Sequence, residues 1–343
     1  MIRVQRKYEH IKLAHQHSTN NSRTWLENVT LIPNCLGNSA ISDIDLGVTL
    51  GGKYLQAPII INAMTGGYPE AGEINRRLAQ LAAANGLGMA VGSQHAGLEN
   101  PSLQPSYEVV RKVNPDGLIW ANLSARASAK EARQAVDMIA ADGIQLHLNL
   151  AQELAMLEGD RDFSQVSTNL WELVHELKVP VIAKETGNGI ALEEARELTK
   201  MGITTVDVGG HGGTNFINIE NQRGGVLGRE LEAWGLPTAI SLLECLTVDN
   251  LNVIASGGIR SALDAAKCLA LGAEAVGMAL PFLHLTAFND EEMLVFTQRF
   301  IYQLKAIFLL CGARNLTELR QRPLVISGKA QEWMQIRGLK LAR

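Results

Sequence analysis

Cysteine, aromatic residues and long apolar runs are scarce in this sequence. Its 343 residues include only 4 cysteines, which form no C-x-x-C pair, and 5% aromatic residues. A disulfide framework or a zinc knuckle is therefore not expected, and we expect buried, reduced thiols in a cytoplasmic protein. The longest apolar runs, 57–64 and 306–312, are too short to span a bilayer, so no membrane association is expected.

Excess positive charge, a secretory signal and a nucleotide-binding P-loop are also missing. The formal net charge is -4, which disfavours a large basic surface for nucleic acid or anionic lipid. The first residues, MIRVQRKYEHIKLAHQ, are charged but contain no apolar core of a signal peptide. No G-x-x-x-x-G-K-[ST] motif occurs, and the glycine pattern at 86–92 lies within an expected strand rather than after one. These absences favour a small molecule as the partner.

Eight short apolar or alternating segments are present, with helical patterns between most of them. A helix-type spacing that stops at Gly occurs, for example, at 73–86. Strand and helix alternating eight times predict parallel strands in a closed (β/α)₈ TIM barrel, with a doubly wound open sheet as the alternative. The segments span 57–67, 86–94, 117–124, 143–150, 180–187, 204–213, 252–258 and 274–281.

The chain is expected to form a single barrel domain over residues 1–343. Its barrel core would span 57–285, because the eight segments lie there. An N-terminal extension, 1–56, and a C-terminal helical part, 286–343, account for the remaining length.

The segment GIQLHLNL, from Gly143, alternates apolar and polar residues, as a strand does. In a barrel, its polar residues Gln145, His147 and Asn149 would face the lumen, with Asn149 nearest the C-terminal rim, where barrel active sites lie. The alternative is a polar core layer that satisfies its own hydrogen bonds.

Lys184 ends the fifth segment on the face of Ile182 and is also expected to point inward. A lumen lysine needs an anion or an electron-rich ring beside it, such as a flavin. The alternatives are a Schiff-base lysine and a salt bridge at the rim with Glu185.

Glycine clusters follow the sixth, seventh and eighth segments, at 209–215, 256–260 and 277–281. Glycine lets backbone N–H groups approach an anion closely, and phosphate binding after the last strands is common in barrels. These clusters therefore predict a phosphate site, to which Thr214 would add a hydroxyl group; ordinary turns are the alternative.

A metal site is expected after the fourth segment. A single carboxylate, Glu153, could hold Mg²⁺ together with phosphate oxygens and water. The alternative for Glu153 is a solvated residue in the first turn of a helix. Arg6 and Lys7 could hold an anion or form a solvated basic tail.

Several motifs together resemble the FMN-dependent type 2 isopentenyl diphosphate isomerase family, from end to end of the chain. The specific ones are HLNLAQE, EGDRDF and the N-terminal RK, whereas MTGG or SGGIR alone would indicate only a flavin or phosphate barrel. The others are RKYEH, APIIINAMTGG, VGSQ, KETGNGI, VDVGGHGGT, IASGGIR and RPLVISGKAQEWMQIRG.

The resemblance implies an enzyme that interconverts isopentenyl and dimethylallyl diphosphate in isoprenoid biosynthesis, without net redox change. Reduced FMN would serve as acid and base, Mg²⁺ would bind the diphosphate, and NADPH would serve only to reduce the flavin. The subunits would form a homotetramer or a larger assembly. By the same resemblance, FMN would be held by Ala63, Met64, Thr65, Ser93, Asn122, Lys184, Thr214, Gly258, Arg260, Ala279 and Leu280.

The resemblance also implies a diphosphate site made of Ser93, His95 and Asn149, with Arg6 and Lys7 donated by a neighbouring subunit. Gln152 would lie beside the reacting carbons, and Glu153 would hold Mg²⁺. The catalytic group would thus comprise Gln152, Lys184 and Asn149.

Four positions depart from the family pattern. His95 stands where the family often has Arg, which would weaken the diphosphate grip or make it depend on pH. Leu157, Phe216 and Ser124 replace a common Pro, Trp and Gly, which affects loop geometry more than reaction type. Three alternatives remain: an FMN oxidoreductase of the 2-hydroxy-acid oxidase or dihydroorotate dehydrogenase kind, a flavin-binding module without activity, and a flavin-free barrel that uses a Schiff base.

Overall fold

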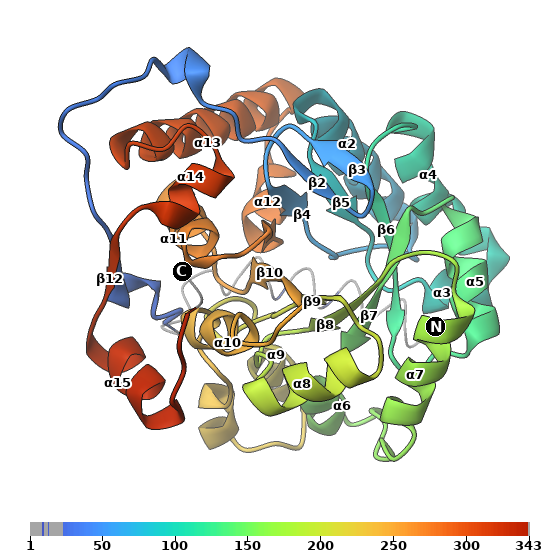
Figure 1. The fold of residues 1–343 in the computed structure, drawn as a ribbon. Coiled ribbons are helices and arrows are strands. Elements are labelled where there is room, and N and C mark those ends of the chain that lie inside the picture. Colours follow the sequence, from blue (N-terminus) through green and yellow to red (C-terminus); the bar gives the residue numbers. More distant parts are fainter. Residues whose placement is uncertain (1–8, 10–12, 14–22, 342–343) are drawn as a thin grey trace.

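Eight parallel strands close into a barrel in this computed structural model, which describes Glu9, Leu13 and residues 23–341 (Figure 1). The ring closes where the last strand pairs with the first, for example Val276 with Ile59. The predicted (β/α)₈ barrel is therefore confirmed, and the open sheet is excluded. The strands are β4 (Ile59–Ile61), β5 (Gly88–Ala90), β6 (Ile119–Ser124), β7 (Gly143–Leu148), β8 (Val181–Glu185), β9 (Thr205–Asp207), β10 (Asn252–Ser256) and β11 (Ala275–Met278).

Helices connect successive strands and surround the barrel (Figure 1). Local capping explains several of their bounds: Ser128 and Ser261 begin two of them with capping boxes, and Gly86 ends another in the left-handed region at φ 59°. The helices are α2 (Pro69–Asn85), α3 (His95–Glu99), η3 (Pro101–Leu103), α4 (Pro105–Val113), α5 (Ala129–Met138), α6 (Leu150–Ala155), α7 (Val166–Glu176), α8 (Leu192–Lys200), α9 (Phe216–Gln222), η4 (Arg229–Ala233), α10 (Thr238–Cys245), α11 (Ala262–Leu271) and α12 (Leu280–Leu285).

The parts of the chain before and after the barrel pack against each other. The short strands β1 (Val29–Leu31) and β12 (Leu324–Ile326) form an antiparallel pair. Buried Glu244 of α10 accepts hydrogen bonds from Trp333 and Arg337, and so fixes the last helix to the barrel's outer layer. The remaining elements are η1 (Leu26–Asn28), η2 (Ile41–Asp43), α13 (Asp290–Leu310), α14 (Leu316–Gln321) and α15 (Gly328–Arg337). The predicted boundaries at 56 and 285 stay a prediction.

A hairpin closes the N-terminal end of the barrel. Its strands, β2 (Val48–Leu50) and β3 (Lys53–Leu55), place Leu50 and Leu55 against Trp120 and other apolar lumen residues. Lys53 of the hairpin donates to the carbonyl of Asp116, which precedes β6. The barrel can therefore be open only at its C-terminal end.

The lumen changes from apolar to polar along the strands. Ile60, Trp120, Ile182 and Ile254 belong to the apolar cluster inside the barrel. Two residues further along the same strands come Asn62, Asn122, Lys184 and Ser256, all buried. Since side chains two apart share a face of a strand, the strand period itself places polar groups towards the C-terminal mouth.

The cysteines differ from the expectation in one respect. Cys245, Cys268 and Cys311 are buried free thiols, but Cys35 is exposed. The expectation of four buried thiols is therefore wrong for Cys35, which follows β1 in a segment of largely exposed residues.

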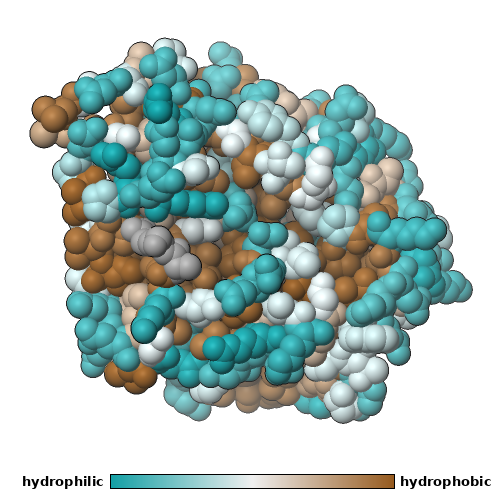
Figure 2. Space-filling model, in the orientation of Figure 1, coloured by the Kyte–Doolittle hydropathy of each residue, from teal (hydrophilic) through white to brown (hydrophobic). Residues whose placement is uncertain are grey.

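The surface is mixed in character. Hydrophilic residues occupy much of the edge of the view in Figure 2, and hydrophobic residues gather across its middle. Among the described residues, sixteen large hydrophobic side chains are exposed, and five of these lie on or just before α13, on the outside of the barrel. By length and composition alone, α13 could also cross a membrane, with 28% of its most apolar stretch buried.

Candidate active site

The polar layer of the lumen is organised around the carboxylate of Asp207, which is fully buried. Lys184 forms an ion pair with it, with Nζ 2.9 Å from Oδ2. Asn62 donates to the same oxygen at 2.8 Å, and Ser256 donates to Oδ1. A buried ion pair needs such additional hydrogen bonds to offset desolvation. The lumen therefore presents one lysine whose position is fixed by three strands.

The neighbouring carboxylate, Glu185, has a different task. It accepts backbone N–H bonds from Gly187, Asn188 and Gly189 at 2.5–3.0 Å, and so holds the loop after β8. Burial raises the pKa of Glu185 to about 7, although these N–H groups lower it in part. The alternative salt bridge between Lys184 and Glu185 is wrong, because adjacent strand residues point in opposite directions. Lys184 pairs with Asp207 instead.

Backbone N–H groups without partners gather where β9 and β10 end. Those of Gly213, Thr214, Gly257 and Gly258 make no hydrogen bond to any residue that the structure describes. The two loops touch: a Cβ added to Gly213 would lie 2.6 Å from the nitrogen of Gly258. Several free N–H groups close together form an anion-binding concavity. We call these four residues the glycine cradle.

Arg260 fixes the two loops of the glycine cradle relative to each other. Its guanidinium donates to the carbonyls of Gly212 at 2.7 Å and Gly258 at 3.0 Å. Thr24, from the N-terminal part, packs against the same two glycines.

Substituting Gly258 with alanine should weaken binding of a phosphate-bearing ligand at least tenfold. The new Cβ would lie 2.2 Å from the carbonyl oxygen of Gly212, so the loops must separate. Gly52→Ala is the matched control, because φ is similar (+78° against +73°) but no atom lies within 4 Å. Fluorescence titration with FMN measures the effect; equal affinities in the two variants would remove the cradle from the phosphate site.

A second group of polar side chains follows β7. Asn149 immediately precedes α6 and donates from Nδ2 to Glu153 Oε1 at 3.0 Å and to Gln152 Oε1 at 3.4 Å. The second oxygen of Glu153 accepts from the backbone N–H of Asp160 at 3.0 Å. Asn149 thereby positions both the amide and the carboxylate that follow it.

Buried charges lie on the other side of Gln152. Its Nε2 donates to Glu220 of α9, which is 1% exposed, at 3.5 Å. Arg223 forms ion pairs with Glu220, with Glu158 at 3.1 Å and with Glu9 at 2.9 Å. Burial alone would lower the pKa of Arg223, but these carboxylates raise it above its ordinary value. Hydrogen bonds at both its oxygen and its nitrogen therefore fix the orientation of the Gln152 amide.

The predicted site residues lie at or just after the C-terminal ends of the barrel strands. Thr65, Asn122 and Lys184 are buried. His147 contacts Asn122 through Nδ1 at 2.7 Å, and Gln145 donates to Asn62 at 3.5 Å, as expected for lumen-facing residues. Ala63, Met64, Ser93, His95, Thr214, Gly258, Ala279 and Leu280 are half-buried, and Arg260 is exposed. Arg6 and Lys7 lie outside the described residues.

Five residues of the candidate site were not predicted from the sequence: Asn62, Asp207, Ser256, Glu220 and Arg223. Asn62 and Ser256 could have been found by counting two residues along each strand from an inward apolar residue, whereas Asp207 follows Thr205 and has no such marker. Glu220 and Arg223 carry no such signal, because α6 and α9 meet only in three dimensions.

The chain's own groups fit both cofactors implied by the resemblance. The glycine cradle suits a terminal phosphate, and the lumen lysine suits an electron-rich ring, as FMN would provide. The described residues contain no group of three or more His, Cys, Asp or Glu that could enclose a metal. Glu153 alone fits Mg²⁺ bound mainly through phosphate oxygens and water.

Fold and site together define a (β/α)₈ barrel with a glycine cradle and a buried lysine–aspartate pair at the C-terminal ends of its strands. Solved structures agree on the fold: a mandelate oxidase mutant has a TM-score of 0.64 at 17% identity, covering 93% of this chain and 92% of that one. A mutant flavocytochrome b2 has a TM-score of 0.69 at 16% identity, covering 94% and 80%. The family model of FMN-dependent dehydrogenases matches residues 123–326.

The chain belongs to the FMN-dependent isopentenyl-diphosphate delta-isomerase family, as its motifs predicted. The protein of that name from Bacillus licheniformis is 43% identical over 343 residues, covering 99% of this chain and 98% of the relative. The one from Moorella thermoacetica is 46% identical over 337 residues, covering 97% and 96%.

Proposed function

We propose that this protein interconverts isopentenyl diphosphate and dimethylallyl diphosphate, with reduced FMN and Mg²⁺ and without net redox change. The observation that carries the proposal is the combination of a glycine cradle with a fixed lumen lysine, in a chain similar over its full length to delta-isomerases. NADPH would serve to reduce the flavin, and the product would enter isoprenoid biosynthesis in the cytoplasm.

Moving a carbon–carbon double bond by one position adds a proton at one carbon and removes one at another. When bound, reduced FMN would supply an electron-rich ring able to accept and return a proton and to stabilise positive charge. The protein's own task is to bind, orient and exclude water. Lys184, held by Asp207, would stabilise negative charge on the ring.

Gln152 is proposed to position the reacting carbons or to relay a proton through water. An amide has no useful acidity, so Gln152 is not assigned as a general base. Its hydrogen bonds to Asn149 and Glu220 support a fixed orientation. Ser93, His95 and Asn149 would bind the diphosphate together with Arg6 and Lys7 of a neighbouring subunit, in a homotetramer or larger assembly.

Glu153→Gln is expected to raise the Mg²⁺ concentration needed for half-maximal activity by at least tenfold. The neutral amide keeps the size of the side chain but loses the charge that a hard cation prefers. Activity titrated against Mg²⁺ provides the measurement, with Glu172→Gln, at an exposed position of α7, as the control. An unchanged metal requirement would remove Glu153 from the metal site.

Stoichiometry tests the proposed reaction. The protein is incubated anaerobically with isopentenyl diphosphate, Mg²⁺, FMN and a substoichiometric amount of NADPH. Dimethylallyl diphosphate formed far beyond the NADPH supplied supports an isomerase.

The match to the FMN-dependent dehydrogenase model favours one alternative, an oxidoreductase of the 2-hydroxy-acid oxidase kind. Such an enzyme would consume one oxidant or reductant for each product formed. One-to-one consumption of NADPH or oxygen would therefore contradict the isomerase and support this alternative.

A further inference from the structure

The outward face of α13 exposes several large apolar side chains, and nothing in the described chain covers them. The inward face packs into the core through buried Met293, Phe300 and Phe308. On the opposite side, Val295 is 57% and Tyr302 60% exposed. Over its 21 residues the helix is about 31 Å long, so this face is large enough for another helix to pack along it.

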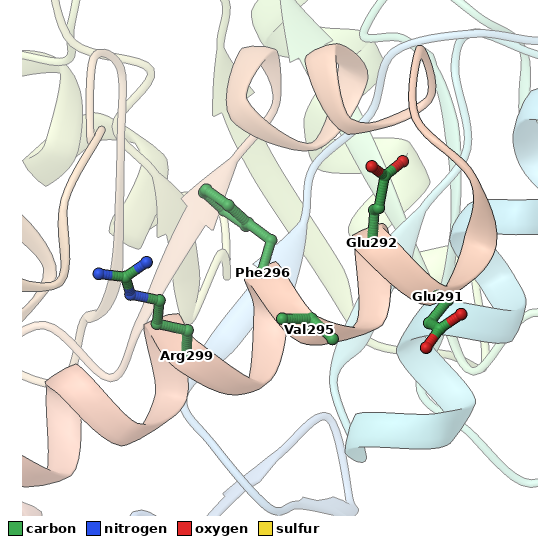
Figure 3. Close-up of a pocket in the computed structure, with 5 residues that line it drawn as sticks. All are labelled: Glu291, Glu292, Val295, Phe296 and Arg299. Carbon is green, nitrogen blue, oxygen red and sulfur yellow. The ribbon is translucent and has the colours of Figure 1, made fainter.

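Residues along this face form a symmetric pattern. Counting outward from Val295, Glu291 and Arg299 lie four residues away on either side, and Tyr302 follows three residues after Arg299. Spacings of three and four place side chains on one stripe of a helix. The order along the helix is therefore acid, valine, base, aromatic; we call Glu291, Val295, Arg299 and Tyr302 the α13 stripe. Glu291, Val295 and Arg299 also line a surface hollow of about 330 Å³, drawn in Figure 3.

The charges of the α13 stripe have no ion-pair partner within the described part of the chain. Neither Glu291 nor Arg299 forms a salt bridge there, whereas Asp290, next to the stripe, pairs with Arg77 at 2.6 Å. The stripe thus offers one acid and one base, on either side of an exposed apolar residue.

These charges decide between a lipid and a protein as the occupant of the face. A lipid surface would have to bury Glu291, which opposes binding to anionic membranes. A protein with a base opposite Glu291 and an acid opposite Arg299 would satisfy both. The same chain, running antiparallel, presents that arrangement.

We infer that the α13 stripe is an isologous interface with a second copy of this chain. With the two-fold axis at Val295, each Glu291 faces the Arg299 of the other copy. A register centred on Arg299 would instead oppose two guanidinium groups, which disfavours it. This inference does not depend on the proposed reaction.

Charge reversal tests the interface. Arg299→Glu and Glu291→Lys each place like charges opposite one another and are expected to halve the mass of the assembly in sedimentation velocity. Combining both substitutions restores the opposite charges and should restore the mass. Glu291 is chosen over Glu292 because Glu292 completes the capping box of α13 with Asn289. Lys200→Glu, on exposed α8, is the control and should leave the mass unchanged.

Three results would overturn the inference. One is a monomeric wild-type protein at micromolar concentration. Another is an unchanged mass in both single variants, or a double variant that stays dissociated. The third is wild-type protein that sediments with vesicles of phosphatidylglycerol and phosphatidylethanolamine when Val295→Glu does not, since that assigns the face to lipid.

Discussion

Replacing Lys184 with methionine is expected to lower turnover by at least about 10²-fold and to weaken FMN binding. Methionine keeps much of the volume but removes the lumen's fixed cation, and loss of one preorganised electrostatic group costs about that much in other enzymes. Fluorescence titration with FMN and turnover at saturating FMN measure the two effects separately. Near-normal turnover would refute the assignment of Lys184.

The same substitution leaves Asp207 as a buried carboxylate without its cation, which costs about 3–5 kcal/mol of unfolding free energy. Loss of activity could then reflect loss of fold. Adding Asp207→Asn removes the uncompensated charge and should recover most of that stability in urea denaturation. If the double variant is stable yet active, Lys184 has a structural task only.

Arg223→Gln is expected to reduce kcat about 10²-fold while KM changes little. The substitution leaves Glu220, which is 1% exposed, without its ion-pair partner, so this carboxylate must move or take up a proton. Gln152 then loses the acceptor that fixes its Nε2, and small displacements at a reacting centre cost about this much. Steady-state kinetics with isopentenyl diphosphate provide the measurement.

Two further variants separate positioning from a general loss of stability. Arg223→Lys keeps a cation beside Glu220 and should restore a large part of kcat. Arg133→Gln removes another Arg–Glu pair, with Glu176, in which both side chains are about half exposed, and should change stability by less than about 1 kcal/mol. If kcat in Arg223→Gln falls only in proportion to the fraction of folded protein, Arg223 has no positioning task.

The barrel was predictable because its signals are local. Each strand is a short apolar or alternating segment, and caps such as Ser128 and Gly86 mark the helix ends in the sequence itself. The inward direction of Gln145 and Lys184 follows from the period of two along a strand, which needs no knowledge of neighbouring strands.

The partners of these residues were harder to predict from the sequence, because they depend on the register between neighbouring strands. Lys184 and Asp207 lie directly opposite each other on β8 and β9, and nothing within either segment specifies that alignment. Asp207 also stands at the start of a glycine-rich stretch, a pattern that indicates phosphate binding and not a lumen residue.

The charge cluster around Gln152 could not be predicted from the sequence for a related reason. Arg223 joins Glu9, Glu158 and Glu220, and it lies 214 residues away from Glu9 in the chain. Such a meeting point is decided by how segments far apart in the chain fold together. A sequence pattern that is read segment by segment has no means of detecting it.

The hairpin beneath the lumen also bears on the order of binding events. Because Leu50 and Leu55 close the N-terminal end of the barrel, every ligand must enter and leave through the C-terminal end. A cofactor seated against Lys184 would lie below whatever docks at Asn149 and Glu153, so it must load first and leave last. Excess substrate should therefore slow the dissociation of bound flavin. The protein could then complete many turnovers without exchanging its cofactor.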